Sequence, residues 1–188
     1  MSTLGVVLVW DPLVRWFHWL LVASVATASL TGGGGMRWHV VSGCTVIGLG
    51  VFRLAWGFLG SQHALWRDFV RRPGEVVAYL RQVVAGHPVR FQGHNPAGGI
   101  MVVLLLVTAT GCALAGLILY GVGEFAGPFS GWAGLPTPEA VGWLQQGHRL
   151  LARALLILIA LHLAGVILTG WQHRENLVKS MVTGRKAL

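Results

Sequence analysis

The stretch AGGIMVVLLLVTATGCALAGLILY, residues 97–120, decides the fold, because it holds no charged residue and is long enough to cross a bilayer as a helix. Such a crossing takes about 20 apolar residues. Three other stretches meet this requirement, so the predicted spans are residues 14–31, 40–59, 97–120 and 143–170. None alternates polar and apolar residues as the strands of a membrane barrel do. The sequence therefore predicts an all-α integral membrane protein, in which residues 1–188 form a single four-helix transmembrane bundle.

The composition of the 188-residue chain favours the same class of protein. Hydrophobic residues make up 54% of the chain and charged residues 11%, against about 25% charged residues in ordinary soluble domains. Disordered chains are poor in apolar residues, and so few charges would not cover the surface of a soluble protein. Only two cysteines are present, both within apolar runs, which excludes a scaffold held together by disulfides.

The net charge of +8 is unevenly distributed and predicts the orientation in the membrane. Eleven of the fourteen basic residues lie in or beside the connection between the second and third spans and the two chain ends. The connection between the third and fourth spans holds Glu124 and Glu139 and no basic residue. Because positively charged loops stay in the cytoplasm, both termini are expected there, and no nucleic-acid partner is implied. The first span is expected to be retained, since the residues before it are not a basic signal-peptide region.

A short amphipathic segment lies between the second and third spans. Residues 75–85 place several valines and Leu80 on one side, and Arg81 and Gln82 on another. This pattern is typical of a short helix that lies at the membrane interface.

Four histidines lie in or at the edge of the predicted spans, where ionisable residues are functional candidates. By depth, His39 and His148 lie near the outer face, and His18 and His162 near the inner face. His148 and His162 are fourteen residues apart, so they differ by about 21 Å in depth and point the same way within about 40°. The sequence therefore predicts an outer site, His39 with His148, and an inner site, His18 with His162.

Each predicted site offers two imidazoles from different helices. Zinc usually takes three or four protein ligands, whereas haem iron needs only axial ligands. Small residues follow the histidines and make room for a flat group, although ordinary helix packing in lipid uses them too; they are Gly43, Ala152 and Gly165. No C-x-x-C-H motif is present, which excludes covalent haem attachment. The alternative is that the histidines are neutral and form hydrogen bonds between helices.

Further polar residues accompany these sites. Arg37, Arg149 and Arg153 lie near the outer pair and are predicted to neutralise haem propionates, or else to extend to the interface. His94 precedes the third span, in a segment where Asn95 caps the helix and Pro96 opens it. Since histidine titrates near neutrality, we expect a quinone or proton site at His94 and Arg15. No catalytic residue is predicted.

Several of these motifs together resemble the bacterial cytochrome b561 and Ni,Fe-hydrogenase cytochrome b family. They are RWFHW at 15–19, HVVSG at 39–43, FRLAWG at 52–57, GHNPAG at 93–98 and TGRK at 183–186. The resemblance implies a multi-pass protein of the bacterial inner membrane that holds two b-type haems. It implies that His18 and His162 bind one haem and that His39 and His148 bind the other. It also implies electron exchange with quinone.

The expected function is therefore electron transfer between the quinone pool and a redox partner protein, either a periplasmic cytochrome c or a hydrogenase-like protein. Whether the chain is itself an enzyme or forms a homo-oligomer is left open. One alternative is a superoxide:quinone oxidoreductase of the same fold, which would need the outer arginines to attract the anion, against the charges of Glu124 and Glu139. The other alternative is a membrane anchor subunit that holds no haem.

Overall fold

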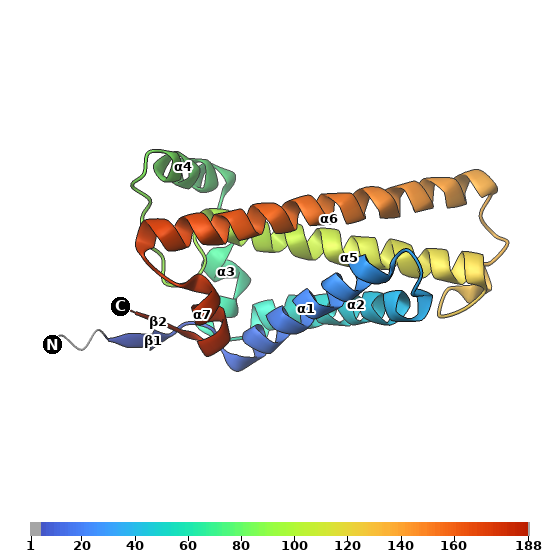
Figure 1. The fold of residues 1–188 in the computed structure, drawn as a ribbon, viewed down its shortest axis with the longest axis horizontal. Coiled ribbons are helices and arrows are strands. Elements are labelled where there is room, and N and C mark those ends of the chain that lie inside the picture. The colour runs from blue at the N-terminus through green and yellow to red at the C-terminus, as the bar shows by residue number, and fades with distance from the viewer. Residues whose placement is uncertain (1–4, 188) are drawn as a thin grey trace. The chain divides into compact units, whose positions relative to one another are not determined.

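The computed structural model describes residues 5–187, and the chain is mostly helical (Figure 1). Within these residues four helices are long and apolar enough to cross a membrane: α1 (Pro12–Thr31), α2 (Met36–Leu59), α5 (Pro96–Glu124) and α6 (Pro138–His173). The predicted all-α membrane fold with four spans is confirmed. The helices run one to five residues beyond most of the predicted limits, because helical hydrogen bonding continues past the apolar stretch into the polar residues beside it.

Three of these helices begin at a proline that follows a side-chain hydrogen-bond acceptor. In each case the side chain before the proline accepts a hydrogen bond from a backbone amide in the first turn. Asp11 accepts from Val14 at 2.9 Å, Asn95 from Gly98 at 2.7 Å, and Thr137 from Ala140 at 3.3 Å. Each bond satisfies an amide that has no partner within the helix, and proline needs none at the first position. The predicted start of the third span at Asn95 and Pro96 is confirmed.

The chain divides into two compact units, which are described separately. The first unit comprises residues 5–18, 53–104 and 158–187, and the second comprises residues 19–52 and 105–157. Each long helix contributes one of its ends to each unit. The first unit contains both chain ends and the connection between α2 and α5. The second unit contains the connections between α1 and α2 and between α5 and α6.

The first unit holds most of the short elements. They are β1 (Val6–Leu8), the 3-10 turn η1 (Gln62–Ala64), α3 (Trp66–Phe69), α4 (Pro73–Val84), α7 (Leu177–Thr183) and β2 (Arg185–Ala187). β1 pairs with β2 in antiparallel register, so the two chain ends lie together beside α7 (Figure 1). Both ends therefore lie on the same side, as an even number of spans requires. The predicted amphipathic helix corresponds to α4, which begins two residues earlier than expected.

The core of the first unit joins the N-terminal segment to the connection that precedes α5. Val9, Trp10, Val14 and Ala64 are buried in one cluster. Phe69 of α3 is also fully buried, and the start of α5 approaches it so closely that a Cβ on Gly99 would clash with its carbonyl oxygen. This packing fixes the segment that carries His94.

The second unit holds the short 3-10 turn η2 (Ser130–Trp132) and the close approach of α2 to α5. A Cβ on Gly50 would lie 2.5 Å from Oγ1 of Thr110, so only glycine permits this approach. Buried Ser24 and Ser42 donate hydrogen bonds to carbonyl groups of their own helices, which satisfies their hydroxyls without a polar core. Many apolar side chains of the long helices are exposed, as expected where lipid covers them.

Candidate functional site

A cavity of about 410 Å³ lies within the second unit, and all four long helices contribute to its walls. Its volume falls within the range of about 300–1,000 Å³ that is usual for cofactor sites. Small residues dominate the lining, among them Ala28, Gly43, Ala109, Ala113, Gly116 and Ala152. Gly43 and Ala152, predicted to make room for a flat group, both lie in this wall.

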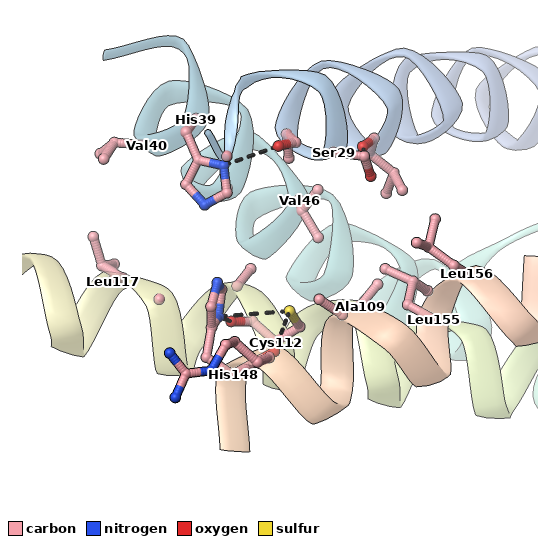
Figure 2. Close-up of a pocket in the computed structure, with 18 of the residues that line it drawn as sticks. Ser29, His39, Val40, Val46, Ala109, Cys112, Leu117, His148, Leu155 and Leu156 are labelled. Atoms are coloured by element: carbon pink, nitrogen blue, oxygen red, sulfur yellow. Dashed lines mark hydrogen bonds between the residues drawn. The ribbon is translucent and has the colours of Figure 1, made fainter. Parts of the chain in front are cut away.

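His39 of α2 and His148 of α6 face each other across this cavity (Figure 2). Their ring centroids are 6.1 Å apart, and the ring planes are inclined at 80°. Nδ1 of His39 lies 2.9 Å from the carbonyl oxygen of Ala28, and Nδ1 of His148 lies 2.9 Å from that of Cys112. Because a carbonyl oxygen only accepts, each Nδ1 carries the hydrogen. The Nε2 lone pairs are therefore free, and these nitrogens point into the space between the rings.

This arrangement fits a single metal ion held between the two rings. A metal–imidazole bond of about 2 Å on each side, with about 1 Å from each nitrogen to its ring centre, gives roughly 6 Å between centroids. Among residues 5–187 no group of three or more metal-binding side chains forms. A site with two imidazoles suits haem iron, because the macrocycle fills the other positions. The Nδ1 hydrogen bonds to carbonyl groups are the usual means of orienting such ligands.

A glycine of α5 makes room for the His148 ring. A Cβ on Gly116 would lie 2.9 Å from Cε1 of His148, closer than real Cβ contacts come. By contrast, a Cβ on Gly43 would meet nothing within 4 Å, so open space adjoins the His39 side. The contact with Gly116 was not predicted, because it joins residues of two helices that are distant in the sequence.

The three outer arginines are placed differently. Arg149 and Arg153 lie one turn apart on α6 and line the cavity, and both side chains are exposed. Arg37 is exposed at the start of α2 and is not among the described residues that line the cavity. The structure therefore brings two of the three arginines to the outer histidine pair.

The inner histidines both belong to the first unit. His18 lies on α1 and His162 on α6, and both are half-buried. The two side chains are close enough to interact electrostatically. The structure thus groups the two histidines that the predicted depths pair.

His94 lies in a buried aromatic setting in the first unit. Its ring centroid is 4.7 Å from that of Trp10 and 4.8 Å from that of Phe69. Its buried Nδ1 has no hydrogen-bond partner among the described residues. Burial, together with nearby positive groups that include Arg53 and Lys186, lowers the pKa of His94 to about 3. His94 is therefore neutral at pH 7 and a weak base, so it suits a group that forms hydrogen bonds and does not support the expected titration near neutrality.

Arg15 of α1 also carries an open donor, since its buried Nε has no hydrogen-bond partner in the described part of the chain. Its guanidinium lies near the C-terminal segment, where a Cβ on Gly184 would be 3.2 Å from Nη1. Both residues predicted for the quinone or proton site, Arg15 and His94, thus belong to the first unit.

Asp11 fastens the start of α1 to the end of α2 in this unit. It accepts hydrogen bonds from Nε1 of Trp56 at 3.3 Å and from the hydroxyl of Ser61, besides the amide of Val14. Burial alone would raise the pKa of Asp11, but these hydrogen bonds outweigh it, and the pKa lies below the usual 3.8. The carboxylate is therefore charged at neutral pH.

Comparison with known proteins gives one family and one curated relative. The profile of the family described as prokaryotic cytochrome b561 matches residues 9–184. A protein of Rhizobium leguminosarum bv. viciae, named "Probable Ni/Fe-hydrogenase B-type cytochrome subunit", is 23% identical over 217 residues, which cover 96% of this chain and 88% of the relative. No solved structure matches the chain.

Proposed function

This chain belongs to the prokaryotic cytochrome b561 family, and from that premise we propose that it carries electrons across the membrane between a quinone and a redox partner protein through two b-type haems. Its family and its four long apolar helices identify the chain as a multi-pass membrane cytochrome of the b type that serves electron transfer. The number of haems, their ligands, the quinone and the bacterial inner membrane are part of the proposal.

The observation that carries the proposal is the geometry of His39 and His148. Two free Nε2 atoms face each other over a distance that suits one iron, and both rings are held by backbone carbonyl groups. The cavity between them is lined by small residues and has the volume of a cofactor site. In this proposal Arg149 and Arg153 neutralise the haem propionates at the same cavity.

The second haem is assigned to His18 and His162 in the first unit. This assignment rests on their depth in the sequence, the electrostatic interaction between them and the family resemblance. Bound haem supplies one-electron redox chemistry. In this proposal His39 and His148 would hold one haem and His18 and His162 the other, so the protein's task would be to hold the haems, orient these histidines and exclude water.

The quinone is assigned to the first unit, beside His94 and Arg15. His94 is neutral at pH 7 and has an open ring nitrogen, so it can form a hydrogen bond with a quinone oxygen or a quinol hydroxyl. Arg15 supplies a second open donor. The printed name of the relative suggests a hydrogenase as the protein partner, and a periplasmic cytochrome c is the other candidate.

One observation favours a second candidate function, the oxidation of superoxide with quinone as acceptor. Arg149 and Arg153 are exposed cations at the outer cavity, and exposed cations attract a small anion. Rapid mixing of the oxidised protein with superoxide distinguishes the two functions. Haem reduction near the diffusion limit would establish the second function, whereas no reduction would remove it.

A spectroscopic and kinetic experiment tests the proposed function. The protein is purified from membranes, its haem content is measured as the pyridine haemochrome, and its reduction by a short-chain quinol is followed in the visible α band. We expect two b-type haems per chain and complete reduction by the quinol. A protein without an α band would be the haem-free anchor subunit, and a haem protein that no quinol reduces would contradict the quinone assignment.

A further inference from the structure

Arg53 of α2 is the most deeply buried charged side chain in the described part of the molecule, with 2% of its surface exposed. Its Nη2 donates to the carbonyl oxygen of Ala64 at 3.0 Å. The guanidinium carbon lies 4.7 Å from the centroid of the Trp66 ring and 5.4 Å from that of Phe69. Its buried Nη1 has no hydrogen-bond partner among residues 5–187. An arginine stays charged in proteins, so this open donor belongs to a permanent cation.

No carboxylate among the described residues of the first unit accepts a hydrogen bond from Arg53. The described residues of this unit include four carboxylates, and each is bonded elsewhere. Asp11 interacts with Arg53 electrostatically, yet no hydrogen bond joins them within the described chain. Each of the four carboxylates binds other partners. Asp11 binds Val14, Trp56 and Ser61; Asp68 binds His63; Glu75 binds the backbone amide of Arg72; and Glu175 binds Arg90 and Lys186.

A buried donor of a cation is unfavourable when it has no hydrogen-bond partner, and Nη1 of Arg53 is such a donor among the described residues. Lys186 of the same unit also acts on His94, but its charge is paired with Glu175 at 3.5 Å. His94 is in turn close enough to His162 for the two to interact electrostatically. His94 therefore interacts with both Arg53 and the proposed ligand His162, and no carboxylate of the described residues binds the open Nη1 of Arg53.

We infer that the open guanidinium edge of Arg53 binds a carboxylate of the haem held by His18 and His162. The inference rests on the proposed function, because it needs the inner haem. A haem brings two propionates, which are anions at neutral pH, and arginine binds a carboxylate with charge-assisted hydrogen bonds. A quinone is neutral and would accept only an ordinary hydrogen bond from Nη1, without the charge assistance that a carboxylate provides. The sequence alone predicts that the outer arginines neutralise haem propionates, and it predicts no role for Arg53.

The test compares three variants of the full-length protein by redox titration of both haems between pH 5 and pH 8. In Arg53→Gln the charge is lost, in Arg53→Lys it is kept, and in Arg67→Gln an exposed arginine of the same unit is changed as a control. A nearby cation favours the reduced haem, and it also keeps the propionate ionised. We expect Arg53→Gln to favour the oxidised form of one haem roughly tenfold, which is 59 mV for one electron, and to make its potential depend on pH. Arg53→Lys should shift it less than threefold, and Arg67→Gln should leave both potentials unchanged.

Haem content and the vibrational spectrum of the haem propionates also test the binding of a propionate by Arg53. If Arg53→Gln loses one haem and Arg53→Lys retains it, the inference is supported. Should Arg53→Gln fail to fold, the propionate bending mode in the resonance Raman spectrum of Arg53→Lys decides, and an unchanged mode contradicts the inference. Unchanged potentials in Arg53→Gln, or a higher KM for quinol as its sole effect, would overturn it. A wild-type protein with one haem, or a His162→Ala variant that keeps both, would instead refute the proposed inner haem.

Discussion

The two histidine pairs lie in very different surroundings. In the second unit, His39 and His148 are oriented by backbone carbonyls in a cavity of small residues, and the nearby arginines are exposed. In the first unit, His162 interacts electrostatically with half-buried His94, whose ring contacts the fully buried Phe69, and the buried cation of Arg53 lies beside Phe69. The proposed ligands thus meet backbone carbonyl groups in one unit and an aromatic cluster with a buried cation in the other. Because hydrogen bonding and burial tune a metal centre, the two haems should differ in potential.

The largest effect should come from removing one histidine of either pair. In His148→Ala we expect the loss of one of two haems, because its iron keeps only one protein ligand. His162→Ala should lose the other haem, with a different change in the α band. Haem per chain, measured as the pyridine haemochrome, checks this, and exposed His87→Ala serves as control. Loss of both haems, or of neither, would break the assignment of one pair to each unit.

A smaller and strictly local effect is expected at Gly116. Alanine there would place its Cβ 2.9 Å from the His148 ring, so we expect the ring to move and the occupancy of the outer site to fall by at least half. Alanine in place of a helical glycine is otherwise stabilising by about 1 kcal/mol. The control is Gly111→Ala on the same helix, whose Cβ would meet Leu151 at an ordinary 3.9 Å. Equal haem content in the two variants would contradict the prediction.

The exposed arginines of the outer site should have a weaker influence than buried Arg53. In the double variant Arg149→Gln, Arg153→Gln we expect a lower potential of the outer haem. The equilibrium between its reduced and oxidised forms should shift toward the oxidised form by less than threefold. Solvent and salt screen exposed charges, so the difference from wild type should vanish at about 1 M salt. Redox titrations at low and high salt measure this. A shift that persists in high salt would mean that these arginines are buried when haem is bound.

The smallest effect concerns the stability of the first unit. The pKa of Asp11 lies below 3.8 in the folded chain, so its charge contributes stability above pH 3.8, and this contribution is lost as the pH falls through the folded-state pKa. Asp11→Asn should therefore lower the apparent Tm at pH 7 by about 2–4 °C, or ~1 kcal/mol. Thermal unfolding in detergent, with exposed Glu124→Gln as control, tests this. The same difference at pH 3 as at pH 7 would argue against a role for the charge.

The features that the sequence predicted are those encoded by neighbouring residues. Apolar runs identified all four spans, and Asn95 with Pro96 identified the start of α5, because caps and hydropathy act over a few residues. The pairing of His39 with His148 followed from depth, since helix rise converts sequence position into depth. The structure then brought their rings to 6.1 Å between centroids.

The features that escaped prediction depend on contacts between distant residues. The pairing of β1 with β2 joins the two chain ends, and neither three-residue strand carries a signal of its own. The burial of Arg53 depends on Ala64, Trp66 and Phe69, which pack over it after the chain has turned back. An arginine inside an apolar span was a visible signal, but its unpartnered Nη1 emerged only from the packed structure.

The haem content of the wild-type protein tests the central claim most directly. The pyridine haemochrome assay, combined with quantitative amino-acid analysis of the same purified sample, gives the number of b-type haems per chain. Two histidine pairs in two separate units predict a ratio of two. A ratio of one would contradict the account, because one of the two pairs would then bind no haem.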